Sequence, residues 1–106
     1  MIDGFVHAAR VDEIPPGGTK VVQVGDRPIA LFNVEGRYYA IYNVCPHEGG
    51  PLGEGSLKGC IVSCPWHDLA FDIRTGHSTD GGGYCVGSYE VRVEGQDILI
   101  GGRRKS

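Results

Sequence analysis

The stretch CPHEGGPLGEGSLKGCIVSCPWHD, residues 45–68, carries the most specific pattern in the chain. It contains two Cys/His pairs, Cys45 with His47 and Cys64 with His67, and a proline follows each cysteine directly. One pair is separated by a single residue and the other by two. Because thiolate and imidazole are both metal ligands, the two pairs predict one metal centre bound by residues of two loops.

The sequence around these loops predicts short β-strands. The 106 residues include 18 glycines and 6 prolines, more than long helices tolerate. Apolar and polar residues alternate between turn residues, and no window has a helical period. The expected strands are residues 5–8, 19–24, 29–34, 37–44, 59–63, 70–73, 88–93 and 98–100. The pattern therefore predicts an all-β, antiparallel fold with both Cys/His segments in loops.

Length and charge limit the organisation of the chain and its partners. A chain of this length predicts a single domain, here residues 1–100, followed by a basic tail at 101–106 that we expect to be flexible. The formal net charge is −3, and three of the ten positive residues lie in the tail, which leaves 7 against 13 acidic residues. This balance argues against nucleic acid and favours docking on a basic partner.

The N-terminus and the cysteines predict a cytoplasmic protein that does not enter a membrane. The segment MIDGFVHAAR lacks the basic run and the apolar run of a signal peptide, and no apolar run is long enough to cross a bilayer. Cytoplasmic thiols stay reduced, so the four cysteines are expected to be ligands or small buried residues. Cys60 and Cys85 lie outside the ligand pattern and are expected in strand cores, although the spacing of Cys60 from Cys64 leaves a zinc knot open.

The spacing of the four ligands separates two kinds of metal centre. Structural zinc sites usually space paired ligands by two to four residues, and Cys-x-His is tighter. The pattern C-x-H, sixteen residues, then C-x₂-H resembles the Rieske [2Fe-2S] family, in which two cysteines bind one iron and two histidines the other. The resemblance implies that Cys45 and Cys64 bind the first iron and that His47 and His67 bind the second.

The resemblance covers nearly the whole chain. It includes both loop prolines, the Phe71-Asp72 and Thr75-Gly76 pairs after the second loop, and the strand-rich layout. It implies short antiparallel strands in stacked sheets, with two cluster-binding loops at one end. Gly49, Gly50 and Gly53 are then expected to let the backbone wrap closely around the cluster.

Family members of this size are similar to Rieske-type ferredoxins, which carry single electrons and are not enzymes themselves. The resemblance implies one [2Fe-2S] cluster, a flavoprotein ferredoxin reductase as donor and a terminal oxygenase as acceptor. It also implies a monomer that docks briefly on each partner. The acidic residues expected to steer this docking to basic sites are Glu48, Glu54, Asp68 and Asp72.

The loop sequences predict a low reduction potential. High-potential members of the family have a disulfide and hydroxyl donors near the cluster, whereas Gly50 and Trp66 stand at the matching disulfide positions here. Leu69 and Phe71 stand at the matching hydroxyl positions. We therefore expect a potential near the low end of the Rieske range, about −150 mV.

Two other functions fit the same ligands. One is a small Rieske-like subunit of a nitrite reductase-type complex, which would copurify with a large catalytic chain. The other is a zinc-binding interaction module, which would be colourless, whereas an iron–sulfur protein would be red-brown.

Overall fold

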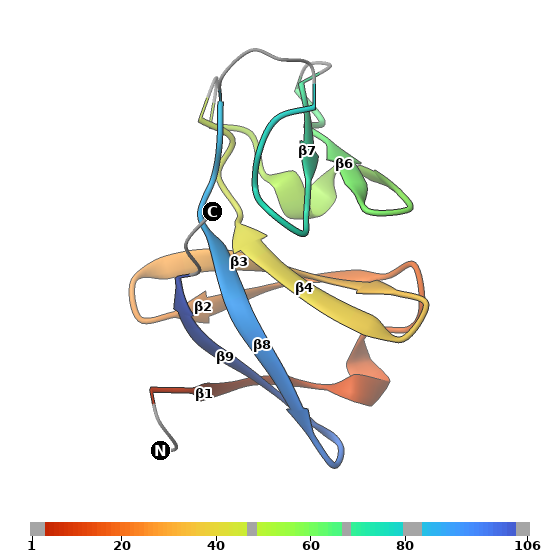
Figure 1. The fold of residues 1–106 in the computed structure, drawn as a ribbon, viewed down its shortest axis with the longest axis vertical. Helices are drawn as coiled ribbons and strands as arrows, with labels where there is room; N and C mark the ends of the chain where they lie inside the picture. The colour runs from red at the N-terminus through yellow and green to blue at the C-terminus, as the bar shows by residue number, and fades with distance from the viewer. Residues whose placement is uncertain (1–3, 47–48, 67–68, 80–83, 104–106) are drawn as a thin grey trace.

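The computed structural model describes residues 4–46, 49–66, 69–79 and 84–103. Its strands form two antiparallel sheets (Figure 1). One sheet has six strands in the order β1-β9-β8-β4-β3-β2, and the other has three in the order β5-β6-β7. The strands are β1 Val6–Arg10, β2 Thr19–Val24, β3 Arg27–Val34, β4 Arg37–Tyr42, β5 Ser56–Lys58, β6 Ile61–Ser63, β7 Ala70–Asp72, β8 Ser88–Glu94 and β9 Asp97–Arg103. The all-β, antiparallel prediction is confirmed.

The six-stranded sheet curls so that its two edge strands, β1 and β2, also approach each other. Tight turns join its hairpins, and between β3 and β4 both Glu35 (φ 53°) and Gly36 (φ 90°) adopt left-handed backbone. Consecutive left-handed residues give a turn whose twist matches that of the flanking strands. This hairpin therefore positions the end of β4, from which the first Cys/His loop starts.

Two hydrophobic clusters lie on opposite faces of β3. Its apolar run buries Ile29 and Leu31 on one face and Ala30 and Phe32 on the other, as expected for a strand covered on both sides. We call the first cluster the inner core; it contains Ala9, Ile14, Val22, Ile29, Leu31, Ala40, Tyr89, Ile98 and Ile100. We call the second cluster the cysteine core; it contains Ala30, Phe32, Ile41, Cys45, Leu52, Val62, Cys64, Leu69, Phe71, Ile73 and Val86.

The end of β9 corrects the expected boundary of the basic tail. The strand continues to Arg103, which pairs with Tyr89, so residues 101–103 belong to the sheet. Two glycines are unusual inside a strand, but a Cβ on Gly101 would lie 2.7 Å from the Phe5 ring. Glycine is therefore required by the close approach of an aromatic ring. Residues 104–106 lie outside the described residues.

The small sheet also differs from the prediction. β5, Ser56–Lys58, was not expected because three residues of mixed polarity show no alternation that can be recognised. Single bridges extend the sheet beyond β7, pairing Phe71 with Ser78 and His77 with Cys85. In the described part of the chain, none of the helical segments could cross a bilayer.

Candidate metal centre

The first Cys/His loop starts just after β4 and is closed by backbone hydrogen bonds. Val44 forms an antiparallel bridge with Pro51, and the Cys45 N–H donates to the Gly50 carbonyl at 2.9 Å. Inside the loop, the Gly49 N–H donates to the Cys45 carbonyl at 2.8 Å. These bonds fix the backbone of Cys45 at the start of the loop.

The second loop, which joins β6 to β7, repeats this closure. Ser63 pairs with Ala70, and the Cys64 N–H donates to the Leu69 carbonyl at 2.9 Å. In both loops the cysteine is the first of six residues and bonds to the carbonyl of the sixth. The similarity of the two Cys/His segments in the sequence therefore extends to the backbone hydrogen bonds that close their loops.

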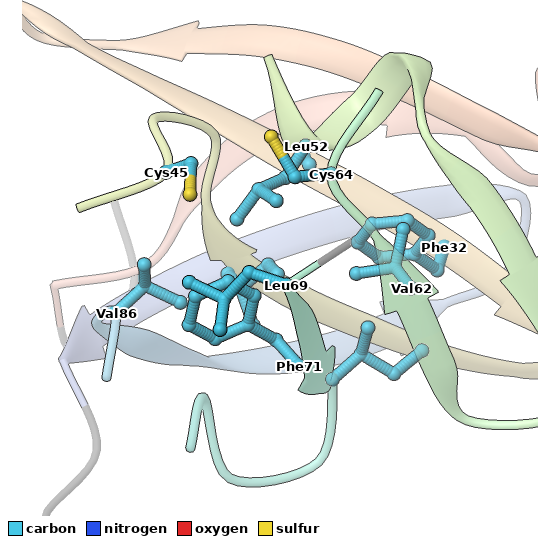
Figure 2. Close-up of a cluster of buried hydrophobic side chains, with 11 residues drawn as sticks. Phe32, Cys45, Leu52, Val62, Cys64, Leu69, Phe71 and Val86 are labelled. Atoms are coloured by element: carbon cyan, nitrogen blue, oxygen red, sulfur yellow. The ribbon is translucent and has the colours of Figure 1, made fainter. Parts of the chain in front are cut away.

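The two cysteines face the same interior. Cys45 is 1 % exposed and Cys64 is 4 % exposed, and both belong to the cysteine core. Figure 2 shows both cysteines on one side of that core, above Leu69 and Phe71. Buried thiols surrounded by apolar side chains suit a centre that must be kept from water.

Gly50 sets how closely the two loops approach. A Cβ at this position would lie 2.7 Å from the Cys64 Sγ and 3.1 Å from the Trp66 ring. Real side chains essentially never come so close to a neighbour, so glycine is needed here to seat the second loop's cysteine against the first loop.

The other two loop glycines have different roles. Gly49 has φ +78°, a left-handed conformation that glycine adopts without strain, and a Cβ there would have ample room. A Cβ on Gly53 would clash with Val21 and with the Asn43 Oδ1. The expectation that all three glycines wrap the cluster is therefore wrong for Gly53, which packs against β2 and the end of β4.

Asn43 is a site-supporting residue that the sequence analysis missed. It is 8 % exposed, and its Oδ1 accepts a 2.7 Å hydrogen bond from the Gly53 N–H. Its backbone carbonyl accepts a second bond from the Leu52 N–H at 2.6 Å. Asn43 thus ties the two ends of the first loop together. The available signal was a lone amide between apolar residues in the run IYNVC.

The two histidines of the pattern, His47 and His67, lie outside the described residues, as do Glu48 and Asp68. The glycines at 81–83 also lie outside them. Within the ranges that are described, no three His, Cys, Asp or Glu side chains converge on a point. Of the four predicted ligands, Cys45 and Cys64 lie within the described residues.

The apolar residues near the loops divide between interior and surface. Leu69 is buried in the cysteine core and Phe71 is fully buried. Trp66 is 60 % exposed, and its ring lies against Gly50. Trp66 therefore contacts the first loop at Gly50 and is largely exposed to solvent.

Asp72 does not have the docking role that was expected from the sequence. Both its oxygens bind the Arg74 guanidinium, at 3.0 Å from Nε and 2.8 Å from the second terminal nitrogen. The side-chain hydrogen bonds from Arg74 lower the pKa of the Asp72 carboxyl. Because its charge is matched by Arg74, Asp72 does not add to the acidic docking surface, whereas Glu54 is exposed.

The cysteines outside the ligand pattern occupy different environments. Cys60 lies half-buried against the cysteine core, close to the expected position. Cys85 is exposed, so the expectation of a core position is wrong there. It lies opposite His77 in an isolated bridge. His7 lies far from both loops in β1, where its Nε2 is 3.1 Å from the Asp97 Oδ1.

The described donors fit a sulfur-ligated cluster. Both thiols are buried in one apolar core, at the first positions of two loops with the same closure. The absence of a side chain at Gly50 brings the second cysteine against the first loop. Thiolates are the protein ligands of iron–sulfur clusters, so the residues present are compatible with such a group.

Comparisons with known proteins identify relatives over most of the chain. The family model for the Rieske [2Fe-2S] domain matches residues 4–85. The ferredoxin component of the naphthalene 1,2-dioxygenase system of Pseudomonas aeruginosa is 34% identical over 106 residues, which cover 94% of this chain and 97% of the relative. The biphenyl dioxygenase ferredoxin subunit of Pseudomonas sp. (strain KKS102) is 36% identical over 99 residues, covering 91% and 90%.

Solved structures share the fold. A chain in the complex of reduced oxygenase and oxidized ferredoxin in carbazole 1,9a-dioxygenase superposes with a TM-score of 0.87, 28% identity and 98% coverage of both chains. A putative nitrite reductase small subunit has a TM-score of 0.80 at 19% identity, covering 91% of this chain and 96% of that one, a likeness of fold alone. On the family match across most of its length, the chain belongs to the Rieske [2Fe-2S] domain family.

Proposed function

We propose that this protein is the ferredoxin component of an oxygenase system. It accepts single electrons from a flavoprotein ferredoxin reductase and delivers them to a terminal oxygenase, and it is not itself an enzyme. The observation that carries the proposal is the match, over nearly the whole of both chains, to ferredoxin components of dioxygenase systems. The likeness to a nitrite reductase subunit is limited to the fold, so it favours no second function.

The proposed ligands of the [2Fe-2S] cluster are Cys45 and Cys64 on one iron and His47 and His67 on the other. Support comes from the spacing of the four residues and from the burial of both cysteines in one core. When bound, the cluster supplies a one-electron redox centre. The loops hold the thiolates away from water and leave no room for a side chain at Gly50.

The proposal includes a low potential. Leu69 and Phe71 are buried beside the cysteines and have no hydroxyl to donate to a cluster sulfur, and Gly50 has no side chain. Hydrogen bonds to the sulfurs stabilise the added electron, so their absence lowers the potential. A value of about −150 mV suits transfer from a flavin to an oxygenase.

The proposed docking surface is centred on Trp66. Trp66 is 60 % exposed and directly precedes the proposed ligand His67 in the sequence. Exposed aromatic residues are enriched in protein interfaces, where they bury a large apolar area. No lysine or arginine occurs at positions 38–57 or 75–91, which contain Glu48, Glu54, Asp80 and Glu90. This acidic character favours a basic rim around the partner's site.

We further propose a monomeric, cytoplasmic protein formed by one Rieske domain. All four cysteines can remain reduced in the cytoplasm. The two cores share β3, which supports a single folding unit.

The test is a transfer experiment with purified, red-brown protein. NADH and a dioxygenase-system flavoprotein reductase should reduce it by one electron per chain, and anaerobic addition of oxidised oxygenase should return that electron. Cys64→Ser is the control, since it should contain no intact cluster and transfer nothing. Reduction by two electrons, or a wild-type protein that never passes an electron to an oxygenase, would reject the carrier function.

A further inference from the structure

A second Cys/His pair lies outside the proposed cluster ligands, at His77 and Cys85. The Ser78 N–H donates to the Tyr84 carbonyl at 2.9 Å, and the Val86 N–H donates to the Gly76 carbonyl at 2.7 Å. These bonds flank the bridge of His77 with Cys85, which makes the two a non-hydrogen-bonded antiparallel pair. In such a pair the Cα atoms are about 4.5 Å apart and the side chains project together from one face.

That face points away from the cysteine core. Val86, next to Cys85, is buried in the core, and Ser78, next to His77, pairs with the buried Phe71. Because side chains alternate along a strand, His77 and Cys85 project from the opposite side. Both are exposed. The pair therefore forms on the outer face of segments whose inner face packs against the cysteine core.

Neither side chain is occupied by a described neighbour. Among the described residues, neither the His77 ring nor the Cys85 thiol forms a hydrogen bond or an ion pair, whereas the His7 ring is bonded to Asp97. A thiolate and an imidazole projecting side by side are ligands that borderline divalent cations prefer.

We propose that His77 and Cys85 form a binding site for a divalent cation of the zinc class. The proposed site has two protein ligands, and the remaining coordination positions are assigned to water. With two protein ligands, binding is weaker and more readily reversible than at a four-ligand structural site. The bound cation cross-links residues 76–78 to residues 84–86, so it also stabilises this part of the fold.

The test uses the cluster-loaded protein, with Cd²⁺ as the probe because a thiolate bound to cadmium has an ultraviolet charge-transfer band. We expect wild-type protein to develop this band while the visible absorption of the cluster stays unchanged. Cys85→Ser should abolish the band, and His77→Ala should weaken the affinity at least about tenfold. The matched controls are Cys60→Ser and His7→Ala, which should both titrate as the wild type does.

Melting provides a second readout. Zn²⁺ should raise the melting temperature of the wild-type protein and of both controls, but not that of His77→Ala or Cys85→Ser. A band that persists in Cys85→Ser, or that grows only as the cluster absorption bleaches, would assign the thiolate elsewhere and overturn the proposal. Equal affinities of the wild type and His77→Ala would overturn it too, since the imidazole would then not be a ligand.

Discussion

Gly50 shows how one residue can fix the distance between two ligand loops. The sequence marks it only as one of several glycines after a histidine, and it predicts that they wrap a cluster. The structure separates their roles: Gly50 faces the Cys64 Sγ, Gly49 supplies a left-handed backbone and Gly53 faces Asn43. The four ligands can be proposed from the sequence because their spacing is specific. The contacts of each glycine were not, because they depend on residues distant in the sequence.

Gly50→Ala should disrupt the site. The new Cβ would lie 2.7 Å from the Cys64 Sγ, so one loop must move away from the other. Overpacking of this kind costs about 1–3 kcal/mol. We expect less iron per chain and a lower melting temperature. Gly102→Ala is the matched control, since a Cβ there meets nothing within 4 Å. If Gly50→Ala retains full iron content and wild-type stability, the close approach is not required.

The Asp72–Arg74 ion pair should give a measurable pH dependence. Because Arg74 lowers the pKa of Asp72 in the folded protein, the pair stabilises the fold above the ordinary carboxyl pKa. That contribution is lost as the pH falls through the lowered pKa. In Arg74→Met, carbon NMR should show Asp72 titrating at higher pH than in the wild type. The same Asp72 titration in both proteins would contradict this interpretation.

At the scale of elements, the two loops are alike in closure but differ in support. The second loop joins two paired strands, β6 and β7, whereas the first follows β4 and closes through a single bridge of Val44 with Pro51. Asn43 supplies the missing support through its side chain. Longer strands bounded by turn residues, such as β2, were predictable. β5 and the bridges beyond β7 were not, because they are too short to show a period.

Removing the Asn43 side chain should therefore loosen the first loop. Asn43→Ala leaves the Gly53 N–H without its acceptor, at a cost of about 1–3 kcal/mol. We expect a lower melting temperature together with faster loss of the cluster. Asn33→Ala is the comparison. The Asn33 side chain donates a hydrogen bond to the Ile14 carbonyl and accepts one from the Gly36 N–H, at the turn that follows β3. This variant should lower stability without accelerating cluster loss; equal rates of loss would show that Asn43 has no special role.

At the scale of the whole molecule, we expect the stability of the two cores to depend on the cluster to different degrees. The inner core lies within the six-stranded sheet, whereas the cysteine core contains both proposed cysteine ligands (Figure 2). Removing the cluster should therefore increase amide hydrogen exchange in β5, β6 and β7 much more than in β1, β2 and β9. Mass spectrometry of peptides from both forms measures this. A uniform increase across both sheets would mean that the cores unfold together.

The central claim is that this chain holds a mixed-ligand [2Fe-2S] cluster of low potential, and a potentiometric titration followed by electron paramagnetic resonance tests it most directly. The account predicts a rhombic signal that appears on reduction at about −150 mV. The same signal near the upper end of the range, about +300 mV, would contradict the low-potential carrier. A colourless, zinc-loaded protein with no signal would contradict the cluster itself.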